Sequence, residues 1–355
     1  MGLFPKQRDL TKPLEEVELM VDASFLRLRA EEVHMRLDQF LALHLTWRSR
    51  SSIQALIKGE YVLVEAPKPG AEAGSAKAEV ETRPGRKLGH GTRVVVVIPE
   101  ELRTNVTPSA SSEVEVLYED DEVIAVDKPA GLVVHPSGRY LGDTLIQRIH
   151  ARYQSEIEAG KMAPRLCHRL DKDTSGIVLI GKRSASHAKV TQQFEDREVT
   201  KEYLAIIKYE PDEELGRIEF GLAASRTSRI GLKMAVAADG LPSRTDWEVV
   251  THYRGYTLVK CRLYTGRQHQ IRVHLSAIGH PIIGDKLYGP DDVYFERALE
   301  DQLTPEDLQV LELPRQALHN HRLVFVTPAG GKTIDVVSPL APDLRAFLDG
   351  KERLG

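Results

Sequence analysis

The chain has 355 residues, of which 41% are hydrophobic and 28% are charged, a composition typical of a globular protein with two or three domains. Its longest aliphatic run, Val94 to Ile98, is far too short to span a bilayer, and we expect no secretory signal because Met1 to Met20 lacks an apolar stretch. The two cysteines form no spaced cluster, which argues against a disulfide framework and a zinc site and favours a reduced, cytoplasmic setting.

The formal net charge of −4 argues weakly against nucleic-acid binding, since RNA-binding proteins usually carry a basic surface. Net charge, however, averages over all surfaces. Between Leu26 and Lys58, six Lys and Arg residues outnumber three Asp and Glu residues, whereas acidic residues gather in 119–122 and 210–214. A surface segregated in this way is still compatible with RNA binding.

The first predicted domain covers residues 21–101 and follows a loose, charged tail of residues 1–20. Apolar residues at helical spacing predict one helix from Met35 to Leu45. A second helix begins after residues 49–52, whose hydroxyl groups are suited to capping it. Two short helices with cations near one rim are able to follow a phosphate backbone.

Gly59 ends the second helix, and the alternation over residues 61–64 predicts a strand. This region is similar to the alpha-L RNA-binding domain, and the motifs that carry the similarity are Arg36-Leu37-Asp38, Ser49-Arg50-Ser51 and Ile57-Lys58-Gly59. The resemblance implies that RNA is bound by Arg36, Arg48, Arg50 and Lys58. One departure is a low-complexity insert near residues 65–82, where the family has a short hairpin. The alternative is a basic helix pair that is merely a solvated face.

A linker over residues 102–112, rich in serine, precedes the second predicted domain, residues 113–345. That domain opens with a β-hairpin made by 114–118 and 123–126. The hairpin ends in Asp127-Lys128-Pro129-Ala130-Gly131, where proline and glycine favour a rigid turn that presents Lys128. The alternative for Lys128 is an exposed residue of a structural turn.

The centre of the chain is His168-Arg169-Leu170-Asp171-Lys172-Asp173-Thr174-Ser175-Gly176, which precedes the apolar run 177–180. This pattern predicts a loop that brings its side chains to the mouth of a buried strand. A carboxylate held there is partly desolvated, so it needs a nearby cation to stay ionised, and Asp171 is our candidate. The alternative is a surface turn. A phosphate-binding loop over 176–182 is rejected because the centre of this segment is a predicted strand. A metal site at Asp171 and Asp173 is rejected because no third ligand lies at a suitable spacing.

Further along the chain, residues 199–207 predict a strand that carries Tyr203 on the same face as Lys201. Residues 223–235 form a basic, Gly- and Ser-containing loop suited to phosphates, with the cations Arg226, Arg229 and Lys233. The block 266–274 begins a helix or a tight turn into a helix, and it contains Arg267 and Arg272. Residues 291–314 are an acidic insertion of uncertain form, and residues 346–355 a C-terminal tail.

Four ordered blocks, at 127–132, 168–176, 201–205 and 266–274, resemble the pseudouridine synthases that modify large-subunit ribosomal RNA. The resemblance covers residues 114–344 and implies an α+β fold, a mainly antiparallel mixed sheet flanked by helices. It implies a catalytic role for Asp171 and a stacking and proton-transfer role for Tyr203. It also implies that Arg169 fills the place of a flipped uridine, and that the other predicted RNA-binding cations are Lys128, Arg267, Arg226, Arg229 and Lys233.

The sequence therefore predicts a cofactor-free, metal-free isomerase that converts uridine to pseudouridine in structured RNA. Arg272 is the predicted ion-pair partner of Asp171. Large-subunit ribosomal RNA is the favoured substrate, with transfer RNA as the alternative, and a monomer is expected. Covalent attack and elimination at Asp171 both stay open. Two other functions remain: an inactive ribosome-associated RNA-binding factor, and an RNA or nucleoside glycosidase that uses Asp173 as a second acid.

Overall fold

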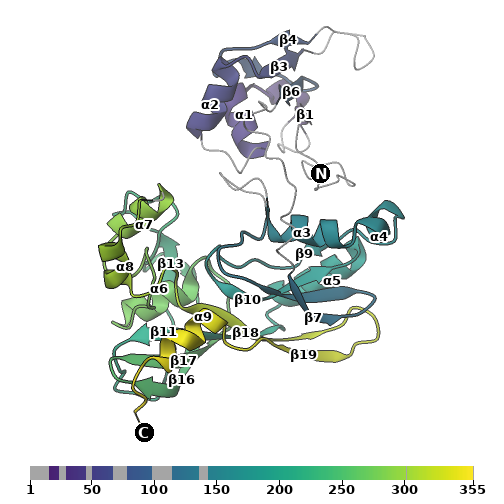
Figure 1. Cartoon of the computed structure of the whole chain (residues 1–355). Helices are drawn as coiled ribbons and strands as arrows, with labels where there is room; N and C mark the ends of the chain where they lie inside the picture. Colours follow the sequence, from purple (N-terminus) through teal and green to yellow (C-terminus); the bar gives the residue numbers. More distant parts are fainter. Residues whose placement is uncertain are drawn as a thin grey trace. The chain divides into compact units, whose positions relative to one another are not determined.

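The structure is a computed structural model that describes residues 16–23, 29–44, 50–66, 78–97, 114–135, 143–300 and 302–354. Its contacts divide the chain into two compact units, drawn in Figure 1, one of residues 1–112 with 135–154 and one of residues 113–134 with 155–355. This division differs from the predicted continuous domain 113–345, because it assigns residues 135–154 to the first unit. The predicted linker 102–112 lies outside the described residues.

The first unit has the predicted order of two helices followed by a strand, α1 (Leu37–His44), α2 (Arg50–Lys58) and β3 (Val62–Glu65). Its core consists of apolar residues at the predicted helical and strand positions, including Phe40, Ile53 and Val62, each fully buried. The remaining elements are η1 (Ala30–Glu32), the paired strands β2 (Met35–Arg36) and β5 (Lys87–Leu88), and α3 (Leu145–Arg152).

The four-stranded sheet of this unit has the order β1-β6-β3-β4, with β1 (Glu16–Met20), β6 (Arg93–Val97) and β4 (Glu79–Val80). The predicted loose tail 1–20 is wrong over its last five residues, because β1 pairs antiparallel with β6 and buries Val17 and Leu19. The predicted insert 65–82 also ends earlier than expected, since β4 pairs with β3. Residues 67–77 of that insert lie outside the described residues.

The second unit is built on a ten-stranded sheet whose main path is β12-β16-β17-β11-β18-β10-β8-β7, with β19 beside β18 and β9 beside β10. All its pairings are antiparallel except that of β10 with β18. The strands are β7 (Glu115–Glu119), β8 (Val123–Lys128), β9 (Arg165–Leu166), β10 (Ser175–Gly181), β11 (Thr200–Lys208), β12 (Leu215–Ile218), β16 (Thr245–Tyr253), β17 (Tyr256–Leu263), β18 (Leu318–Val326) and β19 (Thr333–Val337). The predicted mixed sheet is confirmed.

Helices and a small second sheet complete this unit (Figure 1). The small sheet has the order β14-β13-β15, with β13 (Gly221–Ala224), β14 (Met234–Val236) and β15 (Leu241–Pro242). The helices are α4 (Gln154–Glu158), α5 (Ser184–Glu195), α6 (Gln270–Ala277), α7 (Val293–Leu299), α8 (Pro305–Leu311) and α9 (Pro342–Asp349). The acidic insertion thus contains α7 and α8. The predicted C-terminal tail 346–355 is wrong, because α9 buries Leu348 and Arg353 forms a bridge with Tyr253.

Strand β10 lies at the centre of this unit and is buried along its whole length. Its residues Ile177 and Leu179 join one apolar cluster with Val190 of α5 and Leu323 of β18. At its start, Gly176 has a φ of +111°, and an added Cβ would lie 2.2 Å from the carbonyl oxygen of Asn320. Only glycine allows β10 and β18 to approach this closely, and the loop that ends at Gly176 is placed by that approach.

The substitution Gly176→Ala is expected to lower the free energy of unfolding by at least about 2 kcal/mol, because the methyl group meets backbone and the left-handed φ is strained. Urea unfolding followed by circular dichroism measures the change. The matched control is Gly231→Ala, where an added Cβ meets nothing within 4 Å. It should change stability by less than about 0.5 kcal/mol. Equal effects of the two substitutions would contradict the packing argument.

Candidate active site

The loop before β10 is held at both ends by hydrogen bonds. At its start, His168 accepts a hydrogen bond at Nε2 from the backbone N–H of Leu179 at 3.0 Å, and its ring stacks on Phe194 with centroids 4.6 Å apart. At its end, the N–H of Thr174 donates to the carbonyl of Asp171 at 3.2 Å, closing a tight turn. The direction of the Asp171 side chain is therefore set by the loop backbone.

Lys128 supports this loop from beneath rather than reaching outward. Its side chain is fully buried, and its ammonium donates to the carbonyls of Pro129 at 2.9 Å, Leu132 at 2.9 Å and Lys172 at 3.0 Å. A second link is the N–H of Gly131, which donates to the carbonyl of Lys172 at 2.9 Å. The prediction that Lys128 binds RNA is wrong, and so is the alternative of an exposed lysine, because three carbonyls hold its charge inside the protein.

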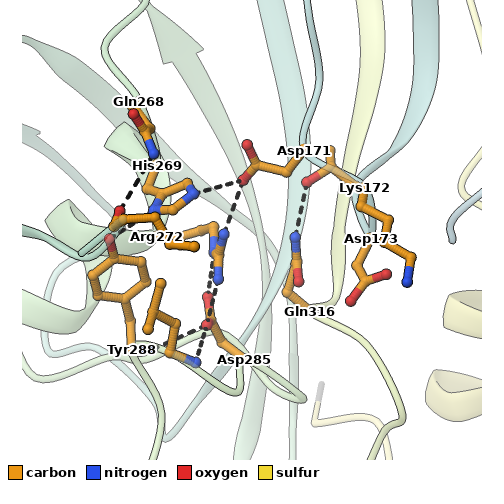
Figure 2. Close-up of polar contacts among 12 residues, drawn as sticks. Asp171, Lys172, Asp173, Gln268, His269, Arg272, Asp285, Tyr288 and Gln316 are labelled. Carbon is orange, nitrogen blue, oxygen red and sulfur yellow. Dashed lines mark hydrogen bonds and ion pairs between the residues drawn. The ribbon is translucent and has the colours of Figure 1, made fainter. Parts of the chain in front are cut away.

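Asp171 forms the predicted ion pair with Arg272, which lies on α6. The Oδ2 atom of Asp171 lies 2.9 Å from Nη1 of Arg272 (Figure 2). The carboxylate is 25% exposed and the guanidinium 7% exposed, so the pair lies at the edge of the protein interior. The Oδ1 atom of Asp171 makes no hydrogen bond within the described part of the chain, which leaves it available to a substrate.

Arg272 also binds a second, deeper carboxylate, Asp285. Its Nε and Nη2 atoms donate to the two oxygens of Asp285 at 2.7 and 2.8 Å. The backbone N–H groups of Leu287 and Tyr288 donate to Asp285 as well, at 2.9 and 3.0 Å. Burial alone would raise the pKa of Asp285, but the Arg272 charge and these hydrogen bonds hold that pKa below its usual range. One guanidinium therefore serves two carboxylates.

His269 and Tyr288 border the ion pair on its other side, as Figure 2 shows. The Nδ1 atom of His269 lies 2.8 Å from the hydroxyl of Tyr288, and its Nε2 atom lies 3.9 Å from Oδ2 of Asp171. The guanidinium carbon Cζ of Arg272 also lies over the Tyr288 ring, 5.0 Å from the centroid of that ring. These contacts surround the carboxylate with groups of fixed orientation.

Tyr203 lies on β11, where the strand pairing shifts register just before it. Its side chain is buried, and burial raises its pKa, with a further contribution from the negative charge of Asp171. No hydrogen bond to its hydroxyl is found among the described residues. The phenol is thus kept neutral and open to a ligand.

Arg169 is an exposed residue of the loop before β10. No hydrogen bond or ion pair of its guanidinium is found among the described residues, yet its charge is close enough to contribute to lowering the pKa of His269. A guanidinium that is exposed beside Asp171 and not bound elsewhere remains able to insert into a nucleic acid. Its predicted role in filling the place of a flipped base stays a prediction.

The cations of the basic loop are not free. Arg226 pairs with Asp239 at 2.6 Å, Arg229 pairs with Glu296 of α7 at 3.3 Å, and Lys233 is hydrogen-bonded to Asp292. Arg267 donates to the carbonyl of Pro242 at 3.3 Å. The ion pairs of Arg226 and Arg229 are exposed and contribute little stability, so phosphates would displace their acidic partners at small cost. Contact of these four residues with RNA stays a prediction.

The predicted RNA-binding cations of the first unit differ in what surrounds them. Arg36 is half exposed and pairs with the buried Asp38 at 2.9 Å, so it also stabilises the start of α1. Lys58, the last residue of α2, is exposed. Arg50 begins α2, but its side chain is not among the described ones, and Arg48 lies outside the described residues. Their role in RNA binding also stays a prediction.

Three members of the site were not predicted: Asp285, Tyr288 and His269. No site residue was predicted in 279–289, although Asp285 of that block is the buried partner of Arg272. In 266–274 the prediction concerned only the two arginines. Within the described residues, no cluster of three or more His, Cys, Asp or Glu side chains could hold a metal ion. The described helices include none long and apolar enough to cross a membrane.

Comparisons with known proteins agree with this geometry. The family described as RNA pseudouridylate synthase matches residues 122–277. A protein of Nitrosomonas europaea named ribosomal large subunit pseudouridine synthase D is 35% identical over 325 residues, which cover 90% of this chain and 85% of that protein. The chain belongs to the RNA pseudouridine synthase family.

Two further proteins similar to this synthase cover about 70% or more of the chain. A protein of Aquifex aeolicus described as an uncharacterized RNA pseudouridine synthase is 35% identical over 268 residues, or 74% of this chain and 80% of that protein. The solved structure of human RNA pseudouridylate synthase domain containing 1 is similar, with a TM-score of 0.53 and 26% identity, and covers 70% of this chain and 92% of that one. The enzyme is an RNA-modifying isomerase.

The stability of this synthase should depend on pH through histidines that are buried in neutral form. Burial lowers the pKa of each of His269, His274 and His319 to about 4, whereas the unfolded chain titrates near 6.5. Below pH 6.5 the unfolded state therefore binds more protons, and stability falls as pH falls. We expect each histidine to reduce the free energy of unfolding by about 2 kcal/mol between pH 7.5 and pH 5.

Urea unfolding at these two pH values measures the effect. The substitution His319→Gln should flatten the pH dependence relative to the unchanged chain, because it removes one of the buried histidines that titrate on unfolding. A free energy of unfolding that is the same at both pH values would contradict the burial of neutral imidazoles.

Proposed function

We propose that this synthase isomerises uridine to pseudouridine at defined positions of large-subunit ribosomal RNA, with Asp171 as the reacting group and no cofactor. The ion pair of Asp171 Oδ2 with Arg272 at 2.9 Å is the observation that carries the proposal. The choice of RNA is supported by relatives named large-subunit pseudouridine synthase D, including the Zymomonas mobilis protein, 33% identical over 322 residues. Transfer RNA is the alternative substrate.

The reaction is balanced within the nucleotide. The bond from ribose C1′ to N1 of uracil breaks, a bond from C1′ to C5 forms, C5 loses a proton and N1 gains one. No oxidant, reductant or group donor is consumed, so the protein has to supply only a held base, a reacting carboxylate and a path for one proton. A uridine within a helix must first be extruded, at a cost of a few kcal/mol.

Asp171 acts through its unpaired oxygen, Oδ1. Arg272 holds Oδ2, and its positive charge lies against the carboxylate when a substrate closes the site and excludes water. From that position the carboxylate is able to attack C1′, which forms a covalent intermediate, or to remove the proton on C2′, which starts an elimination. Both routes require the ionised form, so both depend on the same ion pair.

Tyr203 and Arg169 act on the base and on the helix that it leaves. The raised pKa of Tyr203 disfavours a phenolate, so we assign its ring to stacking on uracil and its hydroxyl to passing on the C5 proton. Arg169 is exposed beside Asp171 and fills the vacated place in the RNA helix, where a planar guanidinium stacks and donates hydrogen bonds. The first unit, with its alpha-L-like helix pair, adds phosphate contacts.

Mapping of pseudouridine in a deletion strain tests the substrate and the reacting residue together. Positions in large-subunit ribosomal RNA that depend on this synthase should revert to uridine on deletion and be restored by the unchanged gene. A gene carrying Asp171→Asn should make folded protein and restore none of them, with turnover reduced by at least about 10³-fold in the purified enzyme. The reason is that an amide neither attacks nor removes a proton.

Asp173→Asn is the matched control, because it changes a neighbouring carboxylate whose Oδ2 atom lies 3.4 Å from Lys286 rather than at the reacting group. It should restore the modification. If the deletion strain instead loses pseudouridine from transfer RNA, the substrate is transfer RNA and not large-subunit ribosomal RNA. Pseudouridine made by Asp171→Asn would refute the mechanism, and free uracil together with a requirement for Asp173 would indicate the glycosidase alternative.

A further inference from the structure

His269 has a backbone conformation that few non-glycine residues adopt. Its φ of 56° and ψ of 17° lie in the left-handed region, directly before α6. Its carbonyl accepts the first helical hydrogen bond, from the N–H of Val273 at 3.0 Å, and the N–H of Gln270 donates to Arg267 at 3.2 Å. These bonds fix the imidazole relative to Arg272, which lies on the same helix. Such strain persists only where the surroundings hold it, and it concentrates at functional sites.

The hydrogen bonds of the Tyr288 hydroxyl decide where the proton of His269 lies. The backbone N–H of Met234 points at this hydroxyl from 2.8 Å, and an N–H only donates, so the hydroxyl oxygen accepts there. The hydroxyl proton then has one acceptor among the described residues, Nδ1 of His269, also at 2.8 Å. With Nδ1 as the acceptor of the hydroxyl proton, the proton of a neutral imidazole lies on Nε2, and this is the tautomer on which the proposal below rests.

Burial keeps the imidazole neutral, so the tautomer decides which ring nitrogen donates a hydrogen bond. The His269 side chain is 7% exposed, and burial lowers its pKa to about 4, with a smaller contribution from the Arg272 charge that opposes the effect of Asp171. At neutral pH the ring therefore carries one proton. That proton faces the ion pair, since Nε2 lies 3.9 Å from the Oδ2 atom of Asp171.

We propose that His269 is a positioning residue for Asp171, with its Nε2–H held toward Oδ2 of the carboxylate by the hydroxyl of Tyr288. The proposal rests on the assignment of Asp171 as the reacting group. At 3.9 Å the contact is longer than a hydrogen bond, and a movement of about 1 Å on substrate binding brings it within range. Oδ2 would then accept from both Arg272 and His269, which leaves Oδ1 as the reacting oxygen and fixes the carboxylate plane.

Two amide substitutions separate this role from a purely structural one. In His269→Gln the amide nitrogen takes the place of Nε2 and is able to donate to Asp171, whereas in His269→Asn the shorter side chain reaches only the place of Nδ1. Asparagine tolerates the left-handed backbone better than glutamine does. A structural role of His269 therefore predicts that Asn is the better replacement, and the proposed role predicts that Gln is.

Single-turnover rates with a saturating RNA substrate measure the difference, and urea unfolding of both variants reports any loss of folding. We expect His269→Asn to be ten- to hundredfold slower than the unchanged enzyme, and His269→Gln to be at least tenfold faster than His269→Asn. Equal rates for the two variants, or a faster His269→Asn, would overturn the proposal. Activity that persists in Asp171→Asn would overturn the proposed function instead, so the two failures are distinguishable.

Nitrogen NMR of the ¹⁵N-histidine-labelled enzyme tests the tautomer without reference to activity. The unchanged enzyme should show His269 protonated at Nε2 and unprotonated at Nδ1. In Tyr288→Phe the donor to Nδ1 is lost, so the signals should shift toward a mixture of the two tautomers. A proton on Nδ1 in the unchanged enzyme, or spectra unaffected by Tyr288→Phe, would overturn the proposal even if the activity variants failed to fold.

Discussion

The site of this synthase depends on one guanidinium that binds two carboxylates. Arg272 uses its Nε and Nη2 atoms for the fully buried Asp285 and its Nη1 atom for the partly exposed Asp171. A planar guanidinium with donors on two sides is suited to this task, whereas a lysine ammonium lacks that fixed geometry. Since Asp285 holds Arg272 rigidly, the remaining donor points at Asp171 before any substrate arrives. The cost of orienting the Asp171 carboxylate is thus met during folding.

The fold brings these partners together from distant parts of the chain. The position of Asp171 is set by the close approach of β10 and β18 at Gly176. It is also set by the Lys128 ammonium, which joins the loop after β8 to the carbonyl of Lys172. The position of Arg272 is set by α6, whose first turn starts at the strained His269. Contacts of two strands with the loop before β10, together with the short helix α6, therefore determine the distance between the two charges.

The sequence predicted the parts of this structure that local pattern controls. Apolar runs and turn residues located β10 and the loop before it, and the resemblance of four blocks to a known family supplied Asp171, Tyr203 and Arg272. The strand β1 was within reach of prediction, because Val17 and Leu19 alternate with charged residues, yet the charge of the segment favoured a tail. Lys128 was beyond reach, since nothing local distinguishes a lysine that faces solvent from one that binds three carbonyls. Asp285 and Tyr288 were missed for the same reason, because their partners are far away in the sequence.

The most direct test of the shared guanidinium is the substitution Asp285→Asn, which leaves Asp171 and Arg272 in place. If Asp285 orients Arg272, the single-turnover rate should fall at least tenfold, and the free energy of unfolding should fall by about 3 kcal/mol or more because a buried charge loses its partner. Asp343→Asn is the control, since Asp343 binds the buried Arg315 at 2.7 and 2.8 Å without contact to Asp171. It should leave the rate nearly unchanged. A full rate in Asp285→Asn would contradict the dependence of the site on this interaction.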